Sequence, residues 1–403
     1  MIADVEVATL ARAWGIARPT HVLANVATTI AMKNSAAGLD GIIVGETAIS
    51  TLDHGLHLRG FAIEDLVRKA TYSEVAYLLL HGELPTQELL ADFRAILAEA
   101  AEVPPAILQL LNELPLHVTP MDALRTAVSA LSHFDEQPNE TDDTASLGKA
   151  IRLLGQVPVL IAARHRLTRG LELIDSDPEL SFAGNLLSLL TGRVPTARDE
   201  RALDQSLICY ADLEFNTSTF TARIVASTGS DLHSAVTAAV GALKGPLHGG
   251  ANEDVLDVLL AVDSPTRANM FVRDAVARKR RLAGFGHRVY RDRPDPRAVV
   301  LKDICRELAT TDEQHRLEEI AAAFEAAMWS HKQLRPNVDW PIARLYRMLG
   351  FDAELFTPLF VIARVAGWSA HILEQQRDNR LIAPRANYTG PPPKTFVPLC
   401  ERS

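Results

Sequence analysis

The sequence predicts an all-α protein, and two observations carry that prediction. Aromatic residues make up only 6% of the chain, whereas the strong helix formers Ala and Leu are abundant. Downstream of Gly60, apolar residues recur mostly at the spacing of one helix face, and clusters of Pro, Gly or Asp/Asn separate the periodic stretches. These stretches are more numerous than a simple helical bundle requires.

The first 60 residues differ from the rest of the chain. Residues 1–38 are interpreted as an N-terminal extension, with a short amphipathic run followed by a polar, Ala-rich stretch. Two β-like pieces follow at 41–44 and 47–50, interrupted by Gly45 and by the turn-forming residues 53–55. They predict a small β-hairpin near residues 41–60.

Helical periodicity then continues to the end of the chain. The clearest helix has apolar residues at i, i+3, i+4, i+7, i+8 and i+11 from Leu232 to Leu243. Ser230 or Asp231 is its expected cap, and Gly245-Pro246 its stop. The earlier helical stretches are 73–80, 86–114, 121–134, 145–169 and 178–191.

Composition excludes several classes of protein. A chain of 403 residues that is 47% hydrophobic is too apolar to be disordered, and its length fits two domains or one large one. The net charge of −9 argues against a surface that binds polyanions everywhere. No uninterrupted apolar run approaches the roughly 18 residues of a membrane span, and the N-terminus lacks a basic start. We therefore expect a soluble, cytoplasmic protein.

The spacing of the three cysteines argues against a metal or redox site. Cys209, Cys305 and Cys400 lie far apart, and no pair has the spacing of such a site. We therefore expect no bound metal.

A glycine-rich loop, KGPLHGGAN at 244–252, follows the clearest helix. It presents His248 between a proline and two glycines, where backbone can approach a ligand closely. A tight turn between helices with an incidental histidine is the alternative interpretation.

A basic segment covers residues 278–297, with eight basic and two acidic residues on an acidic chain. Such a concentration indicates an anionic partner. Within it, GFGHR at 284–288 is a glycine-flanked turn whose amides can approach phosphate or carboxylate. A nucleic-acid patch or a plain basic helix end are alternatives, although few aromatic residues accompany the charges.

Two further residues carry candidate chemistry. Asp339 lies beside Trp340 between two prolines, a setting that can raise its pKa and make it a base, although turn formation is the alternative. Arg364 lies in an apolar helix without an acidic neighbour. A buried guanidinium needs an anion, which is either a distant carboxylate of the chain or a bound substrate acid.

Taken in order, these segments resemble the citrate synthase family, including the 2-methylcitrate synthases. The resemblance covers about residues 39–390. Its motifs are EFNTSTFTAR at 214–223, GPLHGGAN at 245–252, GFGHRVY at 284–290 with DPR at 295–297, NVD at 337–339, Arg364 with Gly-Trp at 367–368, and AHILE at 370–374.

The resemblance implies a homodimer of all-α chains, each with a large and a small domain. The large domain would comprise 39–248 and 344–403, and the small domain, 249–343, would close over the active site. The partners would be an acyl-CoA and a 2-oxo acid, without nucleic acid or membrane. The CoA thioester is a substrate, so no cofactor is expected.

The resemblance also assigns roles. His248 would hydrogen-bond the thioester oxygen while Asp339 removes a proton from the α-carbon, and His287 would donate to the oxaloacetate carbonyl. Arg297 and Arg364 would hold the substrate carboxylates.

Further positions are assigned to binding in the same way. Asn216 would bind substrate. The expected CoA contacts are Gly284, Gly286, Arg288 and Arg291.

Two family positions are different here. Leu213 stands where the family has a histidine that polarises the oxaloacetate carbonyl. Ala383 stands where a partner subunit normally supplies an arginine to a carboxylate, and Arg380 or Arg385 are the possible substitutes. A lost oxyanion donor costs about 10²- to 10³-fold in rate, so both changes weaken the oxaloacetate end of the site.

Three functions follow. The first is condensation of acetyl-CoA or propionyl-CoA with oxaloacetate, or with a related, less polar 2-oxo acid, to give citrate, 2-methylcitrate or a similar acid. The second is a non-catalytic or regulatory paralogue that binds CoA esters. The third is a nucleic-acid binder that uses the basic segment.

Overall fold

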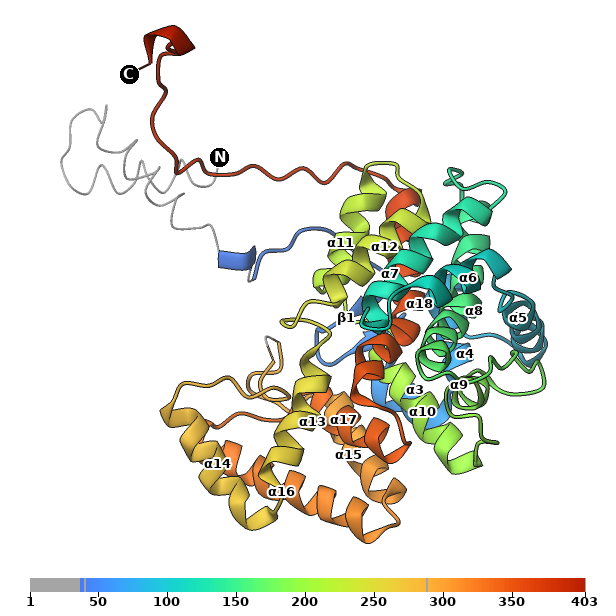
Figure 1. Cartoon of the computed structure of the whole chain (residues 1–403), viewed down its shortest axis with the longest axis vertical. Coiled ribbons are helices and arrows are strands. Elements are labelled where there is room, and N and C mark those ends of the chain that lie inside the picture. The colour runs from blue at the N-terminus through green and yellow to red at the C-terminus, as the bar shows by residue number, and fades with distance from the viewer. Residues whose placement is uncertain (1–36, 40, 288, 403) are drawn as a thin grey trace, which may run out of the picture. The chain divides into compact units, whose positions relative to one another are not determined.

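The computed structural model describes residues 37–39, 41–287 and 289–402, and it confirms the all-α prediction (Figure 1). The short helical turns are η1 (Ala37–Leu39), η2 (Ser132–Phe134), η3 (Ala353–Leu355) and η4 (Leu399–Glu401). The helices of the first half are α3 (Ile63–Lys69), α4 (Tyr72–His81), α5 (Gln87–Glu99), α6 (Pro105–Glu113), α7 (Pro120–Leu131), α8 (Asp143–Thr168), α9 (Phe182–Thr191) and α10 (Ala197–Tyr210). Those of the second half are α11 (Thr217–Ser227), α12 (Leu232–Leu243), α13 (Ala251–Val262), α14 (Pro265–Ala277), α15 (Pro296–Leu308), α16 (Asp312–Lys332), α17 (Asp339–Met348) and α18 (Phe356–Arg377).

The small sheet is present but shifted along the chain. Its three antiparallel strands, in the order β1-β2-β3, are Ser50–Thr51, His57–Leu58 and Phe61–Ala62. The predicted break at 53–55 is indeed the turn between β1 and β2. The predicted strand at 41–44 is wrong, because this stretch has no partner strand among the described residues and is exposed, with Ile43 91% exposed.

Helix boundaries follow local capping chemistry. α4 begins with a capping box in which the Thr71 side chain and Glu74 each satisfy the other's backbone amide. Asp231 caps α12, as the sequence indicates. The predicted helix at 86–114 is two helices, α5 and α6, because Pro104 and Pro105 interrupt the backbone hydrogen bonding and Pro105 starts a new helix.

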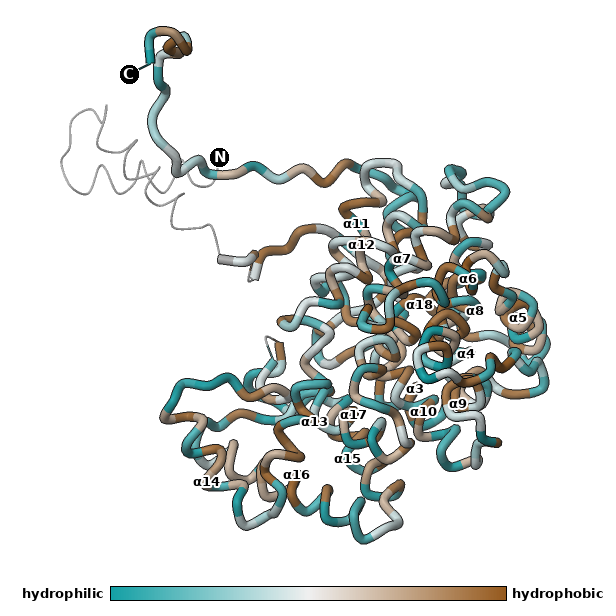
Figure 2. The backbone as a smooth tube through the Cα atoms, in the orientation of Figure 1, coloured by the Kyte–Doolittle hydropathy of each residue, from teal (hydrophilic) through white to brown (hydrophobic). Residues whose placement is uncertain are grey.

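α18 is the central helix of the fold, and it packs against α4, α8, α10, α11 and α12. Apolar residues concentrate along it and along the helices around it (Figure 2). The sequence predicts no membrane span, because it has no long uninterrupted apolar run. By length and composition, however, α8 and the segment from Ala353 to Arg377, which contains α18, are apolar enough to cross a membrane. Their apolar windows are 61% and 100% buried inside the protein, which identifies them as core helices.

Gly367 permits the close packing of α18 against the end of α10. A Cβ atom at Gly367 would lie 2.3 Å from the Ala211 carbonyl oxygen and 2.6 Å from Asp212 Oδ1. No side chain fits there unless the backbone moves. The glycine therefore brings α18, which carries Arg364, against the 211–214 segment.

Helices α13 to α17 pack largely against one another, and α10, α3 and α18 connect them to the remaining helices (Figure 1). Contacts separate a unit that ends at Glu46 from one that begins at Thr47. The predicted extension 1–38 lies outside the described residues except for its last two positions. The predicted division into a small domain, 249–343, and a large domain, 39–248 with 344–403, remains a prediction.

Gly367→Ala is expected to lower the free energy of unfolding by about 1–3 kcal/mol, because its methyl group overpacks against backbone. Gly241→Ala is the matched control within α12, since its Cβ would meet nothing closer than 3.9 Å. That variant should be stabilised by about 0.5–1 kcal/mol. Urea unfolding of both variants measures the difference, and equal stabilities would contradict the packing argument.

Candidate active site

His248 lies in the short loop between α12 and α13. The loop is fixed by hydrogen bonds from the His248 amide to the Gly245 carbonyl (2.9 Å) and from the Gly249 amide to the Leu243 carbonyl (2.9 Å). The imidazole is directed toward the N-terminus of α11, where its Nε2 accepts a hydrogen bond from the Ser218 amide at 3.2 Å. The loop therefore fixes both the position and the orientation of the ring.

These contacts fix the protonation state of His248. Because Nε2 accepts the Ser218 amide, the ring proton resides on Nδ1. Ser218 Oγ lies 2.8 Å from the same nitrogen and itself accepts the Trp368 indole N–H at 3.1 Å. Burial and the nearby Arg364 lower the pKa of His248 to about 4. At neutral pH the residue is therefore an uncharged hydrogen-bond donor through Nδ1.

Asp339 begins α17, and the segment before it pairs with the GFG turn. The Asn337 amide donates to the Gly284 carbonyl (2.9 Å), and the Gly286 amide donates to the Arg335 carbonyl (2.9 Å). At Gly284, φ is +81°, and a Cβ would lie 2.8 Å from a Val255 methyl. Asn337 Oδ1 then accepts the Asp339 amide at 3.1 Å. The glycine turn is thus used to hold the segment that presents Asp339.

The Asp339 carboxylate has the properties of a base. Burial raises its pKa to about 6, although a hydrogen bond from Tyr210 and the charges of Arg297 and Arg364 oppose that shift. The Tyr210 hydroxyl donates to Asp339 Oδ1 at 2.6 Å. Asp339 is therefore ionised at neutral pH and more basic than an ordinary aspartate.

His287 is also an uncharged donor, with the opposite tautomer. Its Nδ1 accepts the amides of Val289 (3.1 Å) and Tyr290 (3.3 Å), so the ring proton resides on Nε2. Burial and the charge of Arg297 lower its pKa to about 4. The ring packs against Tyr290 with centroids 4.7 Å apart, which holds Nε2 in a fixed direction.

Arg364 is buried and lacks a full set of partners. Its Nε donates to the Tyr210 carbonyl at 2.6 Å, and its guanidinium carbon lies 4.8 Å from the Phe360 ring centroid. Its Nη1 is buried with no hydrogen-bond partner among the described residues. Burial lowers its pKa to about 10. An unpartnered guanidinium nitrogen in this setting fits an incoming carboxylate.

Arg297, the second buried arginine, is already paired. Its Nε and Nη2 donate to Asp295 Oδ1 (3.0 Å) and Oδ2 (2.8 Å). Burial opposes its charge, yet Asp295 holds the pKa of Arg297 above its ordinary value. The charges of Arg297 and Arg364 both oppose the rise in the Asp339 pKa. Arg364 also lowers the pKa of His248, and Arg297 that of His287. The fold thus brings the five predicted residues into one electrostatic neighbourhood.

Comparison with known proteins places this constellation in a family. The sequence model of the family described as citrate synthase, C-terminal domain, matches residues 38–385 of this chain. Citrate synthase 2 of Bacillus subtilis is 42% identical over 368 residues, which cover 91% of this chain and 99% of that protein. 2-Methylcitrate synthase 2 of Corynebacterium glutamicum is also 42% identical, over 91% of this chain and 97% of that protein.

This chain belongs to the citrate synthase family. Among solved structures, citrate synthase from Pyrobaculum aerophilum matches with a TM-score of 0.84 and 38% identity, over 91% of this chain and 95% of that one. The ternary complex of citrate synthase from Thermoplasma acidophilum with carboxymethyl coenzyme A and oxaloacetate matches with a TM-score of 0.85 and 31% identity, over 91% and 99% of the two chains. The resemblance and the fold predicted from sequence are therefore confirmed.

Asn216, a predicted substrate ligand in this family member, caps α11. Its Oδ1 accepts the Thr219 amide at 3.2 Å, and its Nδ2 donates to the Leu213 carbonyl at 3.2 Å. Both ends of the side chain are thus used to form the N-terminus that holds His248 through Ser218. Its contact with substrate remains a prediction.

The two positions that depart from the family pattern lie in different surroundings. Leu213 is partly buried against the core, in the segment that precedes α11. The adjoining Glu214 has φ +44°, a strained backbone conformation next to the site. Ala383 is exposed, as are Arg380 and Arg385.

The predicted CoA contacts are described only in part. Arg291 is exposed, and Arg288 lies outside the described residues. The Gly286 amide and carbonyl bond to Arg335 and Asn337, so they are occupied in holding the Asp339 segment. Contact of these four positions with CoA remains a prediction.

Sequence reasoning missed three residues of the site: Tyr210, Ser218 and Trp368. Ser218 and Trp368 lie inside the motifs that carry the family resemblance, but a hydroxyl and an indole have no distinctive spacing signal. Tyr210 reaches Asp339 across 129 positions, and only the fold reveals that contact.

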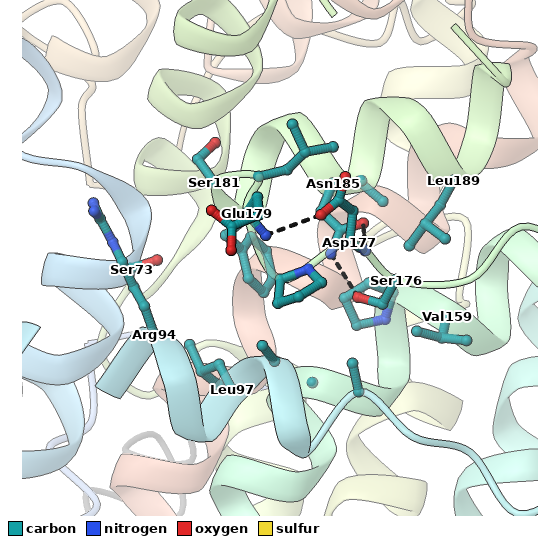
Figure 3. Close-up of a pocket in the computed structure, with 18 residues that line it drawn as sticks. Ser73, Arg94, Leu97, Val159, Ser176, Asp177, Glu179, Ser181, Asn185 and Leu189 are labelled. Carbon is teal, nitrogen blue, oxygen red and sulfur yellow. Dashed lines mark hydrogen bonds between the residues drawn. The ribbon is translucent and has the colours of Figure 1, made fainter. Parts of the chain in front are cut away.

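Two other features of the protein lie apart from these residues. A cavity of about 330 Å³ between α5, α8 and α9 is lined by residues such as Arg94, Ser176 and Asn185, and by none of the predicted site residues (Figure 3).

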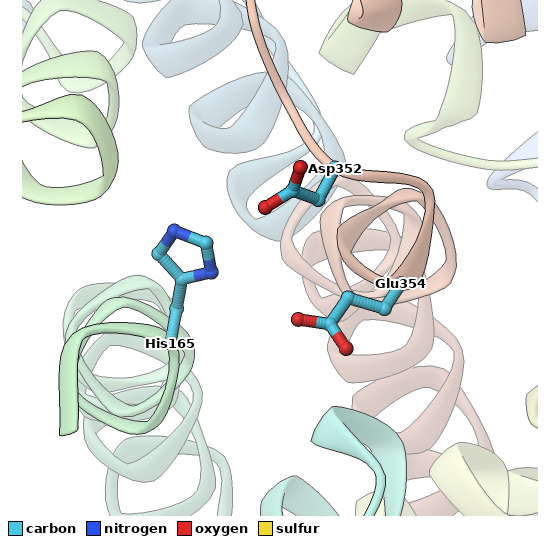
Figure 4. A group of neighbouring side chains, drawn as sticks. All are labelled: His165, Asp352 and Glu354. Carbon is cyan, nitrogen blue, oxygen red and sulfur yellow. The ribbon is translucent and has the colours of Figure 1, made fainter. Parts of the chain in front are cut away.

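The second feature is a cluster of His165, Asp352 and Glu354, which joins α8 to η3 (Figure 4). Arg169 Nη2 lies 2.5 Å from Asp352 Oδ2 and 2.9 Å from Glu354 Oε1. Its guanidinium neutralises both carboxylates, so the group is an ion-pair cluster that anchors the start of α18.

The two site histidines are expected to be neutral and in opposite tautomers at pH 6, because their pKa values are about 4 and different nitrogens accept backbone amides. ¹⁵N NMR of imidazole-labelled protein measures this, with His248→Gln and His287→Gln used to assign the signals. A protonated ring at pH 6, or the same tautomer for both residues, would contradict the geometry.

Proposed function

We propose that this chain condenses an acyl-CoA, either acetyl-CoA or propionyl-CoA, with oxaloacetate to give citrate or 2-methylcitrate and free CoA. The observation that carries the proposal is the Asp339 carboxylate, whose pKa is raised by burial and which feels the charges of Arg297 and Arg364. The same two arginines lower the pKa values of the neutral imidazoles of His287 and His248. The names of the relatives, which are citrate and 2-methylcitrate synthases, support the same reaction.

The first step is enolisation of the thioester. Asp339 removes a proton from the α-carbon of the acyl group, and the His248 Nδ1–H donates to the thioester oxygen as negative charge develops there. A neutral histidine suits this role because it is already a donor at neutral pH and carries no net charge that its buried setting would have to stabilise.

The second step forms the carbon–carbon bond. The nucleophilic α-carbon attacks the carbonyl carbon of oxaloacetate as the C=O π bond breaks, and the His287 Nε2–H hydrogen-bonds the alkoxide that forms. Protonation of this alkoxide to a hydroxyl balances the proton that Asp339 removed from the α-carbon. Arg364 and Arg297 bind the carboxylates of the 2-oxo acid. Water then cleaves the thioester to release CoA and the tricarboxylic acid, and no cofactor takes part.

CoA binding is assigned to the basic segment 278–297, whose Arg291 is exposed and whose charge suits phosphate. Arg288 and the Gly284–Gly286 turn belong to the same proposal. Closure of the 249–343 domain would exclude water from the enol.

The homodimer and the cytoplasmic location also belong to this proposal. The chain beyond α18 carries apolar side chains that one protomer leaves exposed: Tyr388, Phe396 and Leu399 are 74–78% exposed. A second copy of the chain offers a surface that would cover them. The burial of both long apolar helices in the core supports a protein that works outside the membrane.

Asp339→Asn is expected to abolish CoA release from acetyl-CoA or propionyl-CoA with oxaloacetate, measured by thiol titration, because an amide cannot accept the proton. Asp303→Asn, an exposed carboxylate on α15, is the matched control and should retain full activity. In the unmodified enzyme, kcat/KM should fall about tenfold per pH unit below about pH 6, since Asp339 acts as the carboxylate. Turnover that survives Asp339→Asn would refute the proposal. Absence of turnover in the unmodified enzyme would favour a non-catalytic paralogue.

Leu213→His is expected to raise kcat/KM for oxaloacetate by about 10- to 100-fold, because it restores a donor near the acceptor carbonyl. Leu213→Met, which changes shape without adding a donor, is the control. If the histidine variant gains nothing with oxaloacetate while the unmodified enzyme prefers a less polar 2-oxo acid, the acceptor is that acid.

A further inference from the structure

We infer that Tyr210 is a positioning residue that pins one oxygen of the Asp339 carboxylate and leaves the other free to receive the substrate proton. The inference rests on the proposed function, because it concerns the base of the same condensation. It adds a residue that neither the motifs nor the relatives' names point to.

The hydrogen bond from Tyr210 to Asp339 is short, and its donor stays protonated. The Tyr210 hydroxyl lies 2.6 Å from Asp339 Oδ1, and its oxygen also receives the Asn252 amide at 3.5 Å. Burial and the neighbouring carboxylate raise the pKa of Tyr210 well above its ordinary value. The phenol therefore stays protonated across the working pH range, and its single proton is committed to Asp339.

The rest of Tyr210 is held rigidly. The side chain is fully buried, and its ring stacks on Phe360 with centroids 3.8 Å apart and an interplanar angle of 15°. Its carbonyl accepts the Arg364 Nε at 2.6 Å. Tyr210, at the end of α10, thus contacts Asp339 through its side chain and Arg364 through its backbone carbonyl.

The arrangement gives the two carboxylate oxygens different tasks. Oδ1 of Asp339 accepts the phenol, whereas Oδ2 has no hydrogen-bond partner among the described residues. The proton from the α-carbon is therefore taken by Oδ2. The phenol also stabilises the ionised form, which keeps the buried carboxyl available as a base near neutral pH.

Tyr210→Phe tests this role, because phenylalanine keeps the ring stack and the backbone contact to Arg364 and loses only the hydroxyl. The acid limb of kcat/KM should move up by about one pH unit or more, since hydrogen bonds to charged groups are worth about that much. The kcat should fall about tenfold or more, while the KM for oxaloacetate stays within about twofold.

Tyr72→Phe is the control for a structural effect. The Tyr72 hydroxyl is equally buried and bonds the α18 backbone at Ile362 and Ala363, without contact to Asp339. This variant should lower the melting temperature but leave the acid limb where it is. An unchanged acid limb in Tyr210→Phe, or the same shift in Tyr72→Phe, would overturn the inference.

A second readout separates this inference from the proposed function. ¹³C NMR of labelled aspartate, assigned with Asp339→Asn, follows the Asp339 carboxyl without any substrate. Its pKa should be higher in Tyr210→Phe than in the unmodified protein. If no acyl-CoA is turned over but this shift occurs, the function fails and the role of Tyr210 in tuning the carboxylate stands; with no shift, the role of Tyr210 fails.

Discussion

The central constraint on the structure is the charged guanidinium of Arg364, which lies in the buried core helix α18. Arg364 lies in α18, which is enclosed on all sides, and its Nη1 has no partner among the described residues. Such a charge destabilises a core unless an anion compensates it. The glycine at 367, the carbonyl of Tyr210 and the ring of Phe360 hold this arginine in place. The buried Asp212 carboxylate offsets part of this cost, because its charge opposes the lowering of the Arg364 pKa.

Most of the fold could be predicted because local signals agree with it. The period of α12, its Asp231 cap and the glycine-proline stop gave nearly the observed boundaries. The errors arose where tertiary contacts decide. Residues 41–44 have strand-forming side chains but no neighbouring strand in the described chain. The helix predicted at 86–114 followed its apolar periodicity, but Pro104 and Pro105 divide it into two helices.

The candidate site was predictable to the extent that its residues lie in distinctive motifs. His248, His287 and Asp339 stand out by loop context, and Arg364 by an unpaired charge in an apolar run, whereas Arg297 stands out only through the family motif in the basic segment. The tautomers of the histidines were not predictable, because backbone amides brought in by folding determine them. The role of Tyr210 could not be predicted either. A tyrosine on the apolar face of a helix end has no sequence signal, and only folding brings its hydroxyl to Asp339.

The pairing of the GFG turn with residues 335–337 has a consequence for timing. His287 and Asp339 follow two strand-like segments that are joined by backbone hydrogen bonds. Any displacement that carries one of them carries the other. In the proposed reaction, the group that polarises the acceptor and the group that deprotonates the donor therefore belong to a single paired unit. If the proposed roles hold, the base that generates the enol is never separated from the donor that prepares its electrophile.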